Sequence, residues 1–176
     1  DDDDDDSPLQ CCKALYGGMA LICSNRVQPA VVDHTYFGLL SAGVASTNSA
    51  NMNEDKEAFF DLFDPTIVDV QFESSLLRGR WKKMIWNLPF NGISVAMGGI
   101  SVDKIVNDPG LRQLAYDIMD ETIAAANTEL MENEEFPALL GDKEKAVMMK
   151  LSDDMGPYKP STTLDFLHRR PMEVRY

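Results

Sequence analysis

The hydrophobic pattern of this chain changes character once, near residue 73, and no strand pattern follows that point. Before it, short apolar runs alternate with Gly, Pro, Ser and Asn, which is typical of strands and helices joined by loops. After it, apolar residues recur with the spacing of amphipathic helices. We therefore expect an α/β part followed by an all-helical part.

The first part contains three segments with the composition of strands, at residues 17–26, 34–43 and 66–72. The sequence EDKEAFFDLF, residues 54–63, predicts a helix between the second and third strands. Asn53 is the expected cap of this helix, and its expected buried side carries Phe59, Phe60, Leu62 and Phe63. Strand, strand, helix and strand in this order resemble the back half of a sheet domain.

The second part contains three long helical patterns. One begins after Ser74 or Ser75 and runs towards Gly98 and Gly99, and the others cover residues 108–131 and 142–155. A shorter helix is expected after Pro160, capped by Ser161 or Thr162, with Asp165 completing a capping box. The buried side of the 108–131 helix is predicted to consist of Leu111, Leu114, Ile118, Thr122, Ala125 and Leu130.

The charge and composition exclude several functions. The formal net charge is −13, of which the aspartates of residues 1–6 supply six, so a nucleic-acid partner is not expected. We expect residues 1–10 to form an acidic, disordered tail. No apolar run reaches the roughly 18 residues of a membrane span and no signal peptide opens the chain, so we expect a cytoplasmic protein. Three cysteines without ligand-like spacing and two histidines predict free thiols and no metal site.

Three polar residues stand out in WKKMIWNLPFNG, residues 81–92, which is otherwise apolar. Lys83, Asn87 and Asn91 are spaced four residues apart and therefore share one side of a helix. A cation with two amides suits a small anionic ligand rich in oxygen, because the lysine offers charge and the amides offer donors and acceptors. Alternatively, the polar stripe faces water or the first part of the chain. The spacing alone favours this alternative.

No Gly-rich phosphate-binding pattern occurs in the chain, neither G-x-G-x-x-G nor a P-loop. If the protein uses a dinucleotide, the motif that would hold the pyrophosphate is not in these residues.

Four segments in order resemble the ketopantoate reductase (2-dehydropantoate 2-reductase) family. GGMALICSNR with VVDHTYFGLLSAG is similar to the late strands of the family's Rossmann-type domain. RGRWKKMIWNLPFNG resembles the helix that opens its helical domain, and DPGLRQLAYDIMDETIAAA resembles the next long helix. YKPSTTLDFLHRRPMEV resembles the family's Ser-x-x-x-Asp … Arg-Pro-x-Glu segment.

The resemblance implies a fold and an organisation. Residues 11–73 would be the C-terminal part of a Rossmann-type NADP-binding domain, which is incomplete here. Residues 74–176 would be an all-α domain of the type that ends 6-phosphogluconate dehydrogenase, itself shortened at its C-terminus. The expected partner is a small 2-oxo acid, with no nucleic acid and no membrane, and a homodimer remains open.

The resemblance also implies an activity, the NADPH-dependent reduction of 2-dehydropantoate to (R)-pantoate in pantothenate biosynthesis. It assigns the role of general acid to Lys83 and substrate binding to Asn87, Asn91 and Ser161. It assigns Glu173 to orienting the substrate hydroxyl, and Asp165 to a structural role. The chemistry agrees, because hydride addition to a carbonyl creates an alkoxide that a lysine can stabilise and protonate.

Some positions depart from the family pattern. Arg169 stands where the family usually has glycine, and Tyr158 where some members have a substrate-contacting asparagine. The family's asparagine ahead of the GGMAL-like strand has no counterpart, since DDDDDDSPLQCC occupies that region. Two alternatives therefore stay open. One is a reductase of another branched 2-oxo acid, and the other is a truncated, inactive domain that serves as a binding or dimerisation module.

Overall fold

The computed structural model describes residues 12, 14–47, 52–73, 75–134 and 137–172. The chain divides into two compact units, Asp1–Gly79 and Arg80–Tyr176. The expected acidic tail at residues 1–10 lies outside the described residues.

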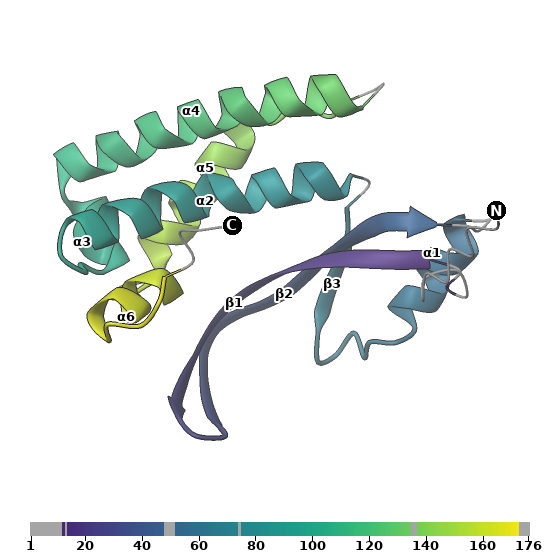
Figure 1. Ribbon diagram of the computed structural model, residues 1–176, viewed down its shortest axis with the longest axis horizontal. Helices are drawn as coiled ribbons and strands as arrows, with labels where there is room; N and C mark the ends of the chain where they lie inside the picture. Colours follow the sequence, from purple (N-terminus) through teal and green to yellow (C-terminus); the bar gives the residue numbers. More distant parts are fainter. Residues whose placement is uncertain (1–11, 13, 48–51, 74, 135–136, 173–176) are drawn as a thin grey trace, which may run out of the picture. The chain divides into compact units, whose positions relative to one another are not determined.

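The first unit contains a small mixed sheet. Its strands are β1 (Ala14–Gln28), β2 (Val31–Thr47) and β3 (Asp69–Phe72), in the order β1-β2-β3. β1 and β2 pair antiparallel as a long hairpin, and β3 pairs parallel to β2 (Figure 1). All three predicted strands are present, although the first two are longer than their patterns indicate and the third is shorter. The excess arises because the antiparallel pairing of β1 with β2 continues to both ends of the hairpin, from Ala14 opposite Thr47 to Gln28 opposite Val31.

Two glycines of the hairpin allow the chain to pass close over the sheet. Gly17 and Gly43 are partners in the β1–β2 register. A Cβ atom on Gly17 would lie 2.6 Å from Cδ2 of Leu76, and one on Gly43 would lie 2.9 Å from the carbonyl oxygen of Glu73. A larger residue at position 43 would displace the backbone that leaves β3, whereas one at position 17 would first displace the Leu76 side chain.

The helix of the first unit, α1, spans Met52–Phe60. The prediction that Asn53 caps this helix is wrong, because the helix already includes Asn53. Phe59 stacks on Tyr16 of β1 with ring centroids 4.4 Å apart, which joins the helix to the sheet. Leu62, predicted to be buried, is 76% exposed, because the helix ends before it.

The second unit is helical. α2 (Leu76–Ala96) enters it at Arg80, followed by α3 (Val102–Asn107), α4 (Pro109–Asn133), α5 (Asp142–Asp154) and α6 (Ser161–Leu167). The long helices α2, α4 and α5 match the predicted ones, whereas α3 was not predicted because it has only six residues. The Asp108 carboxylate caps α4 by accepting hydrogen bonds from the backbone nitrogens of Gly110 and Leu111, at 2.8 and 2.9 Å.

The predicted buried side of α4 is only partly correct. Thr122 and Leu130 are buried as predicted, but Leu114 is 44% exposed. The pattern is ambiguous because apolar residues occur on more than one side of this helix, and only packing against its neighbours selects the buried one. The residues of α4 that are buried are Ala115, Met119, Thr122, Ile123, Ala126 and Leu130.

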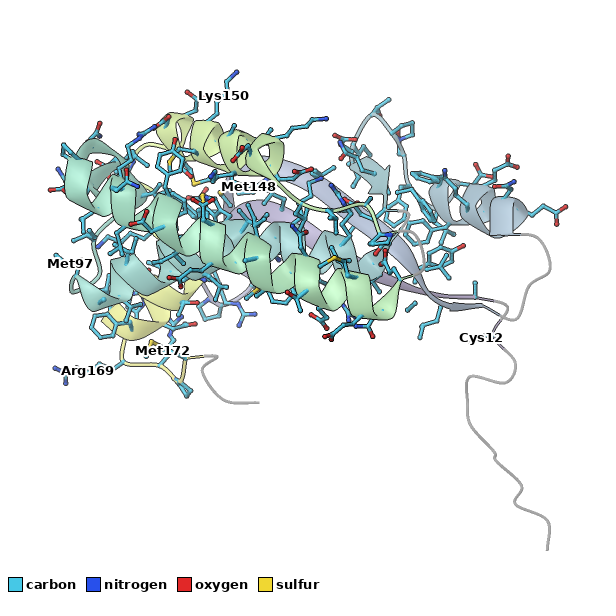
Figure 2. All side chains as sticks on the ribbon, turned by 90° about the horizontal axis from the view of Figure 1, so that it is seen from above. Cys12, Met97, Met148, Lys150, Arg169 and Met172 are labelled. Atoms are coloured by element: carbon cyan, nitrogen blue, oxygen red, sulfur yellow. The ribbon has the colours of Figure 1, made fainter. Side chains whose placement is uncertain are left out.

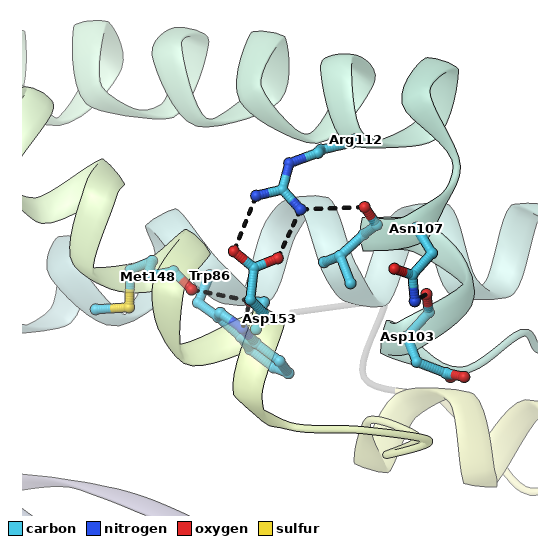
Figure 3. A network of polar contacts seen from close by, with 8 residues as sticks. Trp86, Asp103, Asn107, Arg112, Met148 and Asp153 are labelled. Carbon is cyan, nitrogen blue, oxygen red and sulfur yellow. Dashed lines mark hydrogen bonds and ion pairs between the residues drawn. The ribbon is translucent and has the colours of Figure 1, made fainter.

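Side chains distant in sequence join the helices of the second unit. The Trp86 indole nitrogen donates to the Ser152 hydroxyl at 2.9 Å, which joins α2 to α5 inside the core (Figure 3). The Arg112 guanidinium of α4 donates two hydrogen bonds to the Asp153 carboxylate of α5, of 2.6 and 2.9 Å (Figure 3). On α5, Met148 is buried, while Lys150 extends outwards from the same helix (Figure 2).

Candidate functional site

The structure places Lys83, Asn87 and Asn91 in one continuous helix, α2. All three are half-buried, whereas their neighbours Ile85 and Phe90 are fully buried. The apolar side of α2 therefore packs into the helical unit, and the three polar residues lie along its margin, where they are neither in the core nor fully in water.

Asn91 connects this stripe to the short helix α6. Its amide nitrogen donates a hydrogen bond of 3.4 Å to the hydroxyl oxygen of Thr162. Its carbonyl oxygen Oδ1 is buried and has no hydrogen-bond partner among the residues that the structure describes. A buried acceptor without a donor costs free energy, of roughly 1–3 kcal/mol. The described residues therefore satisfy the Asn91 amide only at its nitrogen.

A second hydrogen-bonded pair holds α6 against α2. The Thr163 hydroxyl donates to the Ser94 hydroxyl at 2.9 Å, and the Ser94 hydroxyl donates to the carbonyl of Ile100. Thr163 and Ser94 are both completely buried. Since each buried hydroxyl finds its partner on the other helix, the relative position of α2 and α6 is specific.

The turn after α2 adds a steric contact to the same junction. Gly98 and Gly99 both have positive φ, of 82° and 90°, a conformation that glycine adopts readily. A Cβ atom on Gly99 would lie 2.6 Å from Cδ2 of Leu167, at the end of α6. The close approach of α6 to the end of α2 therefore requires a glycine at position 99.

Ser161 is the first residue of α6 and is exposed. The prediction that Ser161 or Thr162 caps this helix is wrong, because the N-cap is Pro160 and no side chain caps the helix. The fixed φ of proline and the bend before it start the helix one residue earlier than the capping pattern indicates. Both hydroxyl groups are consequently free of a capping role, and the Thr162 hydroxyl meets Asn91 instead.

Asp165 does not complete a capping box but belongs to the other end of α6. The backbone nitrogen of Arg170 donates to the carbonyl of Asp165 at 2.8 Å, and that of Arg169 donates to the carbonyl of Phe166 at 3.1 Å. Arg169 has a φ of 55°, so these bonds form a Schellman motif with Arg169 in the left-handed position. The Arg170 guanidinium lies 3.9 Å from the Asp165 carboxylate, which adds an ion pair across the motif.

Position 169, where the resemblance implies a glycine, has the left-handed conformation that glycine adopts most readily. The sequence contains the signal in the form of a helix that ends shortly before Pro171, but only the backbone shows which residue takes the unusual conformation. Glu173, expected to orient the substrate hydroxyl, lies outside the described residues.

The described part of the chain contains no group of three or more His, Cys, Asp or Glu side chains that could hold a metal ion. Cys12 and Cys23 are free thiols, as predicted. Among the helices that the structure describes, none has the length and apolar character needed to cross a membrane.

Comparison with known proteins bears on both units. The model of the family described as "Ketopantoate reductase PanE/ApbA C terminal" matches residues 75–176. A 2-dehydropantoate 2-reductase from Nostoc sp. is 28% identical over 162 residues, which cover 91% of this chain and 48% of the relative.

Two solved structures have a similar fold. The crystal structure of 2-dehydropantoate 2-reductase from Geobacter metallireducens has a TM-score of 0.78 and 31% identity, over 90% of this chain and 50% of that one. A dimeric ketopantoate reductase from Staphylococcus aureus has a TM-score of 0.65 and 22% identity, over 90% of this chain and 50% of that one. The second is a likeness of fold alone.

A small mixed sheet followed by a mostly helical region is thus the organisation of the C-terminal part of an oxidoreductase of this class. The chain belongs to the ketopantoate reductase family. It spans about half the length of the relatives that it matches.

The residues present do not fit a dinucleotide cofactor by themselves. The chain has no Gly-rich sequence that could cradle a pyrophosphate, and the described sheet has three strands, of which only β2 and β3 are parallel. No binding mode for a nicotinamide cofactor follows from these residues.

Proposed function

We propose that this chain supplies the substrate-binding and proton-donating part of an NADPH-dependent 2-dehydropantoate 2-reductase that forms (R)-pantoate. One observation carries the proposal: the hydrogen bond between Asn91 and Thr162 brings the start of α6, where Ser161 lies, to the polar stripe of α2. The two segments that the family resemblance assigns to the substrate are 71 residues apart in sequence. Their contact supports a common site.

In this proposal Lys83 is the general acid. Addition of hydride to the carbonyl carbon of a 2-oxo acid leaves a negative charge on the carbonyl oxygen. The ammonium group of Lys83 stabilises this charge and transfers one proton to it, which completes the 2-hydroxy acid. The amine that remains takes a proton from water before the next turnover.

The other polar residues bind the substrate. Asn87 and Asn91 hydrogen-bond to its oxygens without adding a negative charge that would repel the carboxylate. Ser161 lies beside Thr162 at the exposed start of α6, where its hydroxyl can donate to the substrate. Glu173 orients the substrate hydroxyl. NADPH is the proposed reductant, and no residue of this chain is assigned to it.

We further propose that the sheet of the first unit is the last part of a Rossmann-type NADP-binding domain and that residues 74–176 form the helical substrate domain. Residue 73 falls close to the point where the two compact units divide, after Gly79. The proposed setting is the cytoplasm and pantothenate biosynthesis. A homodimer is proposed because the Staphylococcus aureus relative is dimeric.

Binding of pantoate tests the proposal directly, because all the described residues assigned to the substrate lie in the second unit. Calorimetric titration of the chain with pantoate should show binding that is weakened by Asn87→Ala and Ser161→Ala. Asn107→Ala is a matched control, since Asn107 is an exposed amide whose hydrogen bond stays within α3. Absence of pantoate binding would contradict the proposed substrate.

The identity of the 2-oxo acid requires an assay of turnover. NADPH oxidation should be followed with 2-dehydropantoate and then with other branched 2-oxo acids. Turnover with 2-dehydropantoate alone supports the proposal, and turnover only with other acids indicates a different substrate. Neither turnover nor NADPH binding by calorimetry would favour a binding or dimerisation module.

A further inference from the structure

The helix that carries the candidate site is basic, although the chain as a whole is acidic. The formal net charge of the chain is −13, yet α2 contains no Asp or Glu. Its charged residues are all cations, namely Arg78, Arg80, Lys82 and Lys83. Because the first turn of α2 also lacks an acidic residue, nothing on this helix offsets the cations or the positive end of the helix dipole. An anionic ligand would offset both.

Arg80 extends the polar stripe of α2 by one turn towards its start. A helix turns by about 100° per residue, so Arg80 lies about 60° from Lys83 and about 20° from Asn87 around the helix axis. The Cβ atoms of Arg80 and Lys83, three residues apart, are expected to be about 5–6 Å from each other. The other two cations, Arg78 and Lys82, lie about 100° or more from this stripe. Arg80 and Lys83 are therefore the two charges on the side of α2 where the asparagines lie.

The Arg80 guanidinium is accessible to a ligand. Arg80 is exposed, so an anion can reach it from solvent without entering the core. Among the residues that the structure describes, no carboxylate forms an ion pair with Arg80. The other residues one turn away on α2 are Leu76, Leu77 and Met84, which are apolar. The charge of Arg80 is thus not neutralised within its own helix.

We propose that Arg80 binds the carboxylate of the 2-oxo acid while Lys83 acts on the adjacent carbonyl oxygen. This inference rests on the proposed function and adds the group that recognises the acid. The carboxylate is bonded directly to the carbonyl carbon, so the two cations must be neighbours, as residues three apart on a helix are.

The chemistry of the guanidinium supports this assignment. Apart from Lys83, the donors assigned to the substrate are the amides of Asn87 and Asn91 and the hydroxyl of Ser161, which are all neutral. None of them balances the charge of a carboxylate. A guanidinium carries a positive charge and presents two parallel N–H groups that match the two oxygens of a carboxylate.

The test measures whether the preference for a charged acid depends on Arg80. Pantoate and pantoamide, in which a neutral carboxamide replaces the carboxylate, are titrated by calorimetry into the unmodified chain, Arg80→Gln and Arg80→Lys. The branched 2-oxo acid 2-oxoisovalerate is titrated in the same way. Lys150→Gln is the matched control, because it removes one positive charge from a side chain that extends outwards from α5 (Figure 2).

Arg80→Gln should weaken pantoate binding by about ten-fold and leave pantoamide binding unchanged, because only the carboxylate needs the guanidinium. Arg80→Lys should retain part of the affinity for pantoate, since it keeps the charge and loses the paired donors. Lys150→Gln should change the affinity by less than about two-fold, because solvent and salt screen a distant exposed charge. Equal weakening of pantoate and pantoamide in Arg80→Gln, or no weakening of either, would overturn the inference.

The inference and the proposed function can fail separately. If Arg80→Gln binds pantoate as tightly as the unmodified chain, Arg80 does not bind the carboxylate, although the proposed substrate stands. If the chain binds 2-oxoisovalerate but not pantoate, and Arg80→Gln weakens that binding about ten-fold, the proposed substrate is wrong and the role of Arg80 holds. Binding of neither acid would contradict both.

Discussion

The Thr163 hydroxyl donates a hydrogen bond of 2.9 Å to the hydroxyl of Ser94, which lies 69 residues earlier in the chain. Both side chains are completely buried. Ser94 passes the interaction on to the carbonyl of Ile100, in the turn that follows α2. A series of two hydrogen bonds therefore joins α6, the end of α2 and the turn after α2. These hydrogen bonds position the candidate site.

The hydroxyls of Ser94 and Thr163 should contribute unequally to the free energy of unfolding. Ser94→Ala leaves both the Ile100 carbonyl and the Thr163 hydroxyl unpaired, and should lower the free energy of unfolding by about 2–3 kcal/mol. Thr163→Val leaves Ser94 still donating to Ile100 and should cost about 1 kcal/mol. Urea denaturation of the two variants measures the difference. The exposed substitution Thr128→Val is the control and should change stability by less than about 0.5 kcal/mol. Equal losses for Ser94→Ala and Thr163→Val would contradict the two successive hydrogen bonds.

Arg169→Gly should stabilise the chain, because Arg169 has a φ of 55° and glycine adopts this conformation without steric cost. A gain of roughly 0.5–1 kcal/mol is expected, reduced by the greater freedom of glycine in the unfolded chain. Thermal unfolding followed by circular dichroism measures it. The matched control is His168→Gly, whose φ of −87° suits any residue, and which should destabilise instead. A loss of stability in Arg169→Gly would show that the arginine side chain contributes more than its backbone costs.

The ion pair of Arg112 with Asp153 should make the free energy of unfolding depend on pH. Hydrogen bonds from the Arg112 guanidinium hold the pKa of Asp153 below its usual value. A carboxylate with a depressed pKa stabilises the fold above its unfolded pKa, near pH 4, and loses that contribution as the pH falls through its folded pKa.

Asp153→Asn should therefore lower the free energy of unfolding at pH 7, by roughly 0.5–1 kcal/mol because the carboxylate is 42% exposed. The difference from the unmodified chain should disappear well below pH 4. Urea denaturation across this range tests it, with the neighbouring exposed substitution Asp154→Asn as the control. A difference that stays constant down to acid pH would mean that the contact is not electrostatic.

Lys83→Ala should abolish most of the proposed reaction. In a preparation that oxidises NADPH with 2-dehydropantoate, loss of a general acid should lower turnover by roughly 10²–10⁴-fold. Lys82→Ala is the matched control, because it removes the adjacent lysine of the same helix and should leave turnover within a few-fold. Near-normal turnover of the Lys83 variant would remove this residue from the role of proton donor.

Several features followed from the sequence alone. Composition identified all three strands, and periodicity identified the three long helices, because each of these helices has enough residues for its pattern to be distinct. The spacing of Lys83, Asn87 and Asn91 placed them on one side of a helix before any packing was known. The motifs in order identified the family, which the match over residues 75–176 confirms.

Other features depended on contacts between distant residues. The buried side of α4 could not be read from a helix that is apolar on more than one side, and the start of α6 was decided by Pro160 rather than by a capping pattern. The contact of Asn91 with Thr162 and that of Ser94 with Thr163 join residues about 70 positions apart. Local periodicity carries no information on such pairs, since they form only when the helices pack and every buried polar group must find a partner.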